Sequence, residues 1–371
     1  MPIQTALDSI NQNQGSPFGF KNRIINGNMA ISQGAAAATI TPAVTSAYAT
    51  NYPVDRFEVI VGAASKLTTA QSSTAATGFN FSTLITSSSS YTVGAGEIFA
   101  IRHKIEGFNT SDLAFGTVNA QKITLSFWVR SSVTGTFGGS IQNSAASRSF
   151  PFTYTINVID TFEYKTITIP GDTSGTWIGA TNGIGLTINF GLGVGATYSG
   201  TANAWAGADY RSATSATSVV AANLRTFYIT GVQVEKGSTA TSFDYRPYTT
   251  ELALCQRYFT KSFATTTAPA NSSSAPYEGV GASFIGGYFS SNFVPFPVTM
   301  RAVPTMTYFS SPNGTPTNDR WQIYDGGWAN ASSLNGSNIT VNGFQNSWVY
   351  SSATLKGAYY ISGHFTASIE L

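Results

Sequence analysis

Apolar and polar side chains alternate through most of the stretch Lys122-Ile123-Thr124-Leu125-Ser126-Phe127-Trp128-Val129-Arg130. A repeat of two residues is the period of a β-strand that buries one face. Similar patterns, alternating or continuously apolar, recur at 56–61, 98–105, 150–159, 164–169, 184–190 and 224–234. Ser, Thr, Ala and Gly dominate the connections, and no helical segments alternate with these strands. The pattern therefore predicts an all-β fold, an antiparallel jelly-roll β-sandwich.

The amino-acid composition argues against several classes of function. Only 10% of the 371 residues are charged, against about 25% in an average soluble domain. The net charge of +2 offers no electrostatic footprint for nucleic acid or an anionic membrane, so neither partner is expected. The single Cys255 rules out an internal disulfide framework. The first residues do not resemble a signal peptide and no stretch of about 18 apolar residues occurs, so export and membrane insertion are not expected.

A chain of this length predicts more than one folded unit. We expect an N-terminal arm at 1–21, the sandwich at 22–247, a connecting helix and linker at 248–276, and a smaller C-terminal β-domain at 277–371. The helix is predicted at 249–259, where Leu252, Cys255 and Phe259 fall on one face. In the last unit, Asn-Gly steps at 313–314, 335–336 and 342–343 predict hairpin turns.

Four ordered motifs resemble a broad set of phage and prophage tail-fibre-like proteins. They are Asn22-Arg23-Ile24-Ile25-Asn26-Gly27-Asn28-Met29-Ala30-Ile31-Ser32-Gln33, Tyr52-Pro53-Val54-Asp55-Arg56-Phe57, the pair Ile229-Thr230-Gly231-Val232-Gln233-Val234-Glu235-Lys236-Gly237 and Phe243-Asp244-Tyr245-Arg246-Pro247, and Leu254-Cys255-Gln256-Arg257-Tyr258-Phe259. The resemblance implies a sandwich like that of carbohydrate-binding modules, used in virions as a structural or host-facing domain. Two departures, the missing Arg between Gln33 and Gly34 and Phe57 where Trp is common, prevent a transfer of side-chain roles at those positions.

No set of residues indicates catalysis or a cofactor. The two histidines, His103 and His364, lie in strand patterns without an accompanying catalytic motif. Carboxylates are scattered, and Asp319 and Asp325 are the pair to test if glycosidase activity appears. One Cys and two distant His cannot form a zinc site, and no loop has the closely spaced carboxylates of a calcium site. We therefore expect a protein that is not an enzyme and uses no cofactor. No metal site is indicated, and a loop calcium, to which Asp55, Asp209 and Asp244 could each contribute, is left open.

Aromatic residues in polar surroundings are candidates for sugar binding, because an aromatic face matches the apolar side of a pyranose ring. Two of them, Trp205 and Tyr210, lie in a long polar loop of the sandwich. Four more, Trp321, Tyr324, Trp328 and Trp348, gather in the last unit, and Trp328 follows two glycines that leave its ring exposed. The alternative interpretation is that these side chains fill small cores or seams between subunits.

The expected function is a tail fibre or baseplate appendage of a phage particle, made in the host cytoplasm. The expected partners are further copies of the chain, other tail or baseplate proteins bound through the N-terminal region, and a host surface glycan or receptor bound by 277–371. The trimeric state is implied by the resemblance alone. The alternatives are a head decoration or baseplate subunit without host contact, a polysaccharide depolymerase, and a bacterial extracellular carbohydrate-binding protein.

Overall fold

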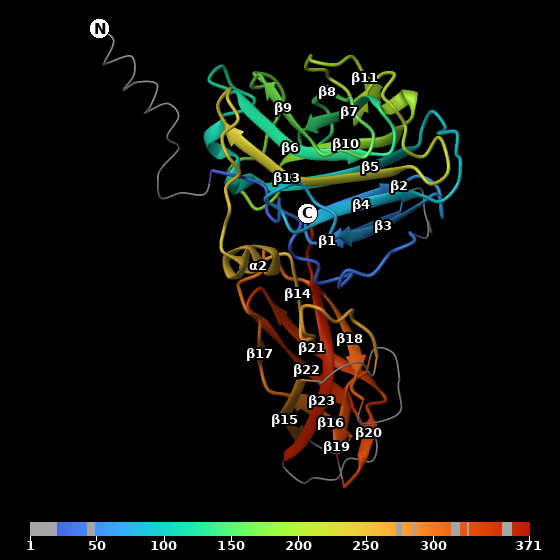
Figure 1. The fold of residues 1–371 in the computed structure, drawn as a ribbon. Coiled ribbons are helices and arrows are strands. Elements are labelled where there is room, and N and C mark those ends of the chain that lie inside the picture. The colour runs from blue at the N-terminus through green and yellow to red at the C-terminus, as the bar shows by residue number, and fades with distance from the viewer. Residues whose placement is uncertain are drawn as a thin grey trace. The chain divides into compact units, whose positions relative to one another are not determined.

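The computed structural model describes residues 21–42, 49–271, 277–284, 287–312, 320–324, 326–350 and 358–371. These residues form two compact units (Figure 1). Unit 1 contains the described residues of 21–30 and 39–247 together with Leu371, and unit 2 contains those of 31–38 and 248–370. Asp319, Asp325, the Asn313-Gly314 step and residues 1–20 of the expected arm lie outside the described residues.

Unit 1 consists of two antiparallel sheets. The six-stranded sheet has the order β1-β2-β5-β10-β7-β8, with strands at Ala49–Val54, Phe57–Val61, Ile98–Glu106, Ile184–Val194, Gly135–Gln142 and Ser149–Ile156. The five-stranded sheet has the order β3-β4-β13-β6-β9, with strands at Leu67–Ser72, Ser82–Ser87, Thr226–Lys236, Ile123–Ser131 and Glu163–Ile169. A parallel pair, β11 (Ser199–Gly200) and β12 (Ser212–Ala213), and three short 3₁₀ helices at Gly107–Asn109, Ser111–Leu113 and Ala196–Tyr198 complete the described elements of this unit.

The two sheets bury a common core between their inner faces. In β6 the alternate residues Leu125, Phe127 and Val129 are buried, as the period of two predicts. The ring of Phe127 contacts Phe190 from the other sheet with 5.0 Å between centroids. Similarly, Phe137 of β7 meets Phe227 of β13 across the core. The predicted antiparallel sandwich is confirmed, and its outer sheet faces are left to carry polar and functional side chains.

Unit 2 is a second, smaller β-structure with its own core around Phe289, Trp321, Phe344 and Trp348. Its strands are β14 (Phe259–Lys261), β15 (Tyr277–Phe284), β16 (Tyr288–Ser291), β17 (Val294–Pro295), β18 (Thr305–Ser310), β19 (Gln322–Tyr324), β20 (Trp328–Asn330), β21 (Ser333–Thr340), β22 (Gly343–Val349) and β23 (Ala358–Ser368). β23 pairs with β14, β15, β18 and β19 and is therefore the central strand. The predicted hairpin at Asn342-Gly343 is confirmed between β21 and β22, whereas Asn335-Gly336 lies at a register shift inside β21 rather than in a turn.

The predicted connecting helix is present as α2, Tyr248–Gln256, but the set of residues on its buried face differs from the predicted set. Its buried residues are Glu251 and Cys255, while Leu252 is half-buried and Phe259 belongs to β14. The segment 31–38 also differs from the predicted boundary, since it belongs to unit 2. The buried Lys261 holds this segment against the rest of unit 2. Its ammonium donates hydrogen bonds to the carbonyl oxygen of Gln33 at 2.6 Å and to those of Thr265 and Thr267.

Candidate saccharide-binding site

A β-bulge on β13 shapes the outer face of the five-stranded sheet. The register between β13 and β6 shifts between Thr230 and Gln233, and Gly231 in this interval has a positive φ of 60°. A Cβ atom at Gly231 would lie 2.6 Å from the Phe79 ring and 3.0 Å from Trp128. Glycine is required on both counts, because it tolerates the left-handed region and lets two aromatic rings lie against the backbone.

The residues of β13 that follow the bulge bind the segment 240–245, which covers part of the outer face of the sheet. Gln233 and Glu235 are buried although they point to the outer face. The Glu235 carboxylate accepts hydrogen bonds from the backbone amide and the hydroxyl of Thr241, both at 2.8 Å. The side-chain carbonyl of Gln233 accepts the backbone amide of Asp244 at 2.9 Å. These bonds fix 240–245 along one side of the sheet face.

The space between this segment and the strands is a pocket of about 450 Å³. Trp128 of β6 and Tyr164 of β9 form one wall, where they are cross-strand neighbours with ring centroids 5.3 Å apart. Phe79, Phe243 and Tyr245 form the other wall, with ring centroids 4.9 to 5.6 Å apart. The aliphatic hydroxyl groups that line the pocket belong to Thr77, Ser126, Thr241 and Ser242.

The pocket combines apolar faces with neutral hydrogen-bonding groups. None of the residues that line it carries a charge. The nearest carboxylate along β9 is that of Glu163, and its hydrogen-bond partners do not line the pocket. It accepts hydrogen bonds from the Lys165 ammonium at 2.7 Å and from the backbone amides of Asn157 and Val158. Burial alone would raise the pKa of Glu163, but these hydrogen bonds lower it to about 2. Aromatic rings facing hydroxyl groups without charge suit a neutral sugar.

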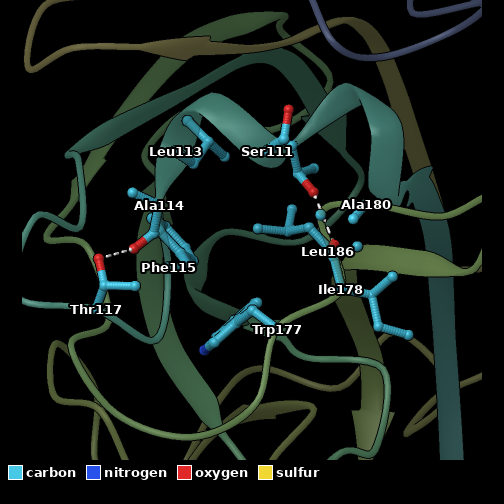
Figure 2. A pocket seen from close by; sticks show the side chains of 12 residues that line it. Ser111, Leu113, Ala114, Phe115, Thr117, Trp177, Ile178, Ala180 and Leu186 are labelled. Atoms are coloured by element: carbon cyan, nitrogen blue, oxygen red, sulfur yellow. Dashed lines mark hydrogen bonds between the residues drawn. The ribbon is translucent and has the colours of Figure 1, made fainter.

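A second pocket of about 300 Å³ lies in the same unit, between the 3₁₀ helix Ser111–Leu113, the loop at 177–180 and the start of β10 (Figure 2). Its walls are more aliphatic than those of the first pocket. They include Leu113, Phe115, Trp177, Ile178 and Leu186.

The six aromatic residues predicted as sugar-binding candidates do not form one site. Trp321 and Trp348 are fully buried in the core of unit 2, with ring centroids 6.2 Å apart, so the prediction that they contact a sugar is wrong. The Trp321 ring lies on the backbone of Gly363, and its indole N–H donates to the carbonyl oxygen of His364. Both rings serve the small core, which was the alternative interpretation.

The two candidates in the long loop of unit 1 are half-buried. Trp205 donates its indole N–H to the carbonyl oxygen of Pro170 at 2.9 Å and contacts the rings of Phe115, Phe150 and Trp177. Trp205 therefore packs against Trp177, which lines the 300 Å³ pocket, but does not itself line that pocket. Tyr210 lies against the backbone of Gly200 and lines neither pocket.

Tyr324 and Trp328 are brought together at the surface of unit 2. They are direct partners across β19 and β20, with ring centroids 5.5 Å apart. Tyr360 of β23, which is 62% exposed and was missed in the sequence, pairs with Tyr324 on its other side. The three rings form an apolar row across three neighbouring strands, but they line neither described pocket.

Neither histidine lines either of the two pockets described above. His103 is buried with its ring 4.8 Å from that of Phe57, and burial lowers its pKa well below the ordinary value, helped by the positive charge of Arg56. His364 is buried in unit 2, stacked on Phe263 and within 3.0 Å of the Ser262 hydroxyl. Within the described ranges, no three His, Cys, Asp or Glu residues are close enough to hold a metal ion, and no helix has the length and apolar character to cross a membrane.

Comparison with known proteins found no matching family model and no matching curated protein. Among solved structures, the enzymatically active domain of bacteriophage CBA120 tailspike protein 4 is similar at 12% identity and a TM-score of 0.29, over 58% of this chain and 22% of that chain. The family 11 carbohydrate-binding module from Clostridium thermocellum, solved with a β-1,3-1,4-mixed-linked tetrasaccharide, matches at 10% identity and a TM-score of 0.26, over 51% of this chain and 91% of that one.

The N-terminal cellulose-binding domain of Cellulomonas fimi β-1,4-glucanase C matches at 16% identity and a TM-score of 0.20, over 43% of this chain and 80% of the other. TM-scores of this size carry no conclusion about ligand or activity. The chain also spans less than a quarter of the tailspike chain that it matches.

Proposed function

We propose that this protein binds carbohydrate through unit 1, in the pocket walled by Trp128 and Tyr164 on one side and by Phe79, Phe243 and Tyr245 on the other. The observation that carries the proposal is the meeting of two aromatic walls and four Ser or Thr residues in one pocket without charged lining residues. Stacking on the aromatic faces would hold the apolar side of a pyranose, while Ser126 and Ser242 would hydrogen-bond its hydroxyl groups.

The biological setting that we propose is a phage particle, in which the chain is a tail-fibre or baseplate-appendage subunit that attaches to a host surface glycan. The ordered motifs between Asn22 and Phe259 and the low charge support this setting. The same proposal includes self-association as a homotrimer and no enzymatic activity. Imaging of labelled antibody on intact particles tests the location, and a monomeric mass in sedimentation at micromolar concentration would contradict the trimer.

A glycan array probed with the full chain and with Trp128→Ala tests the binding proposal directly. We expect the wild type to bind neutral oligosaccharides and the variant to lose at least about tenfold in affinity, equivalent to about 1.4 kcal/mol of aromatic contact. Trp328→Ala is the matched control, because it removes an equally large and half-buried indole from unit 2. Equal affinity of Trp128→Ala and wild type would refute the pocket as the binding site.

Incubation with the glycans that bind separates attachment from hydrolysis. Since the proposal is binding without chemistry, we expect no new reducing ends after prolonged incubation. Release of reducing ends by the wild type would assign the protein to the depolymerases instead.

A further inference from the structure

The 300 Å³ pocket is enclosed by three segments that are distant in the sequence. Figure 2 shows Leu113 and Phe115 on the left of the hollow, Leu186 of β10 and Ile178 on the right, and Trp177 below. The Thr117 hydroxyl donates to the carbonyl oxygen of Ala114 at 2.7 Å, and Ser111 lies at the opposite end. No charged side chain is among the lining residues.

The loop that carries Trp177 is fixed before any ligand arrives. The buried carboxylate of Asp172 accepts two hydrogen bonds from the Arg148 guanidinium, at 2.7 and 2.8 Å. The side-chain amide of Asn143 donates to the carbonyl oxygen of Thr176 at 3.0 Å, and the Trp177 indole N–H donates to that of Ser174. Such a bidentate charged pair holds a loop in one geometry.

The opposite wall is fixed to the same loop. Phe108 and Gly107 donate their backbone amides to the carbonyl oxygens of Thr181 and Gly183, at 3.0 and 2.7 Å. The Thr110 hydroxyl donates to the carbonyl oxygen of Ile178 at 3.2 Å. A Cβ at Gly185 would lie 2.2 Å from the Thr110 hydroxyl oxygen, so the surroundings are tightly packed. An apolar hollow that persists between such closely packed walls is a preformed site rather than a packing fault.

The size and chemistry of the hollow define the ligand. An apolar cavity of about 150 Å³ accommodates benzene, with six heavy atoms. Twice that volume accommodates one monosaccharide rather than a chain. Leu113 and Leu186 are already covered by the protein, whereas Ile178 is half-buried and Ala180 is exposed. An unsubstituted hexose would stack on Trp177 but leave Ile178 and Ala180 in contact with water. A methyl group on the sugar would cover these aliphatic walls, and an amide beside it would find the hydroxyl groups at the rim.

We propose that this second pocket binds a neutral N-acetylhexosamine residue, with the acetyl methyl group against Ile178 and Ala180 and one ring face on Trp177. The inference rests on the proposed carbohydrate binding and adds a second site that is separate from the Trp128 pocket. The two pockets share no lining residue, so that each is tested by its own variant.

Saturation-transfer NMR and calorimetry on the full chain test the proposal, with the methyl glycosides of N-acetylglucosamine, glucose and rhamnose as probes. In the Trp128→Ala background, which removes one aromatic wall of the first pocket, only the N-acetylglucosamine glycoside is expected to bind measurably, with its acetyl methyl protons receiving the strongest saturation. Ala180→Trp, which places a large ring at an exposed lining position, is expected to weaken this binding by about tenfold or more. Trp128→Ala is expected to leave it unchanged, whether or not that variant abolishes oligosaccharide binding.

Ala221→Trp is the matched control, since Ala221 is also exposed and lines neither pocket. Equal binding of the glucose or rhamnose glycoside would overturn the assignment of the acetyl group, and so would stronger saturation of ring protons than of the methyl. Unchanged affinity in a folded Ala180→Trp variant would overturn the pocket. If Ala180→Trp does not fold, the proposal is judged from the wild type alone, by whether the acetyl methyl protons receive stronger saturation than the ring protons.

Discussion

Ser126 stands on the floor of the Trp128 pocket as a small hydroxyl on the outer face of β6. Its neighbours Leu125 and Phe127 point inward, so the side-chain oxygen contributes little to the core. Ser126→Ala is expected to weaken oligosaccharide binding about three- to tenfold, the cost of about one hydrogen bond. The melting temperature is expected to stay within about 2 °C of the wild type. Calorimetric titration with the glycan found on the array measures the loss, and an undiminished affinity would remove Ser126 from the site.

His103 makes the stability of unit 1 depend on pH. Its pKa lies well below the ordinary value in the folded state, chiefly because the side chain is buried and secondly because Arg56 is positive. Below about pH 6.5 the unfolded chain therefore binds a proton that the folded chain does not. The free energy of unfolding is expected to be flat above that pH and to fall below it by about 1.4 kcal/mol per pH unit.

Guanidinium unfolding between pH 5 and pH 8 measures this dependence for the transition of unit 1. His103→Leu is expected to flatten the profile, because the leucine cannot take up a proton in the unfolded state. His364→Leu serves as the control for the other buried histidine, which belongs to unit 2. A slope that persists in His103→Leu would show that another group causes it.

The bulge in β13 affects both the stability of unit 1 and the shape of the proposed binding pocket. Gly231→Ala puts a methyl group into the left-handed region, at a cost of about 1 to 2 kcal/mol, and drives it against Phe79 and Trp128. We expect a less stable protein whose glycan affinity also falls, as measured by denaturant unfolding and the same titration. Gly237→Ala is the control, since its φ is also positive but a Cβ there would meet nothing. Equal losses in both variants would show that the backbone conformation alone matters.

The strand β23 has the corresponding role in unit 2. A Cβ at Gly363 would lie 2.3 Å from the Trp321 ring, which itself is fully buried. Gly363→Val is therefore expected to destabilise unit 2 by about 1 to 3 kcal/mol or more, through overpacking. Gly327→Val, at a position with open space around it, is expected to cost much less. Thermal unfolding followed by near-ultraviolet circular dichroism, which reports on the packed tryptophans, distinguishes the two.

At the scale of the whole molecule, each unit has a separate hydrophobic core within the described residues. We expect calorimetry to resolve two unfolding transitions. Gly231→Ala should lower only the transition of unit 1, and Gly363→Val only that of unit 2. A single transition that both variants shift equally would show that the two cores unfold cooperatively.

The all-β architecture follows from local patterns that need no partner. The alternation through Lys122 to Arg130 assigned Phe127 to the core, and the same period placed Trp128 on the outer face. A large aromatic on an otherwise polar strand face is therefore the signal in the sequence for the Trp128 pocket. The Asn342-Gly343 turn was likewise readable, because its backbone preference is local.

Tertiary structure alone decided which aromatic side chains are available to a ligand. Trp321 and Trp328 have equally polar sequence surroundings, but only Trp321 is covered, since β23 brings Gly363 beneath its ring. The pocket walls come from Phe79, Trp128 and Phe243, which are far apart in the chain and meet only because β4, β6 and β13 share one sheet. Local sequence thus determined the strands, whereas the pairing of distant strands determined both pockets.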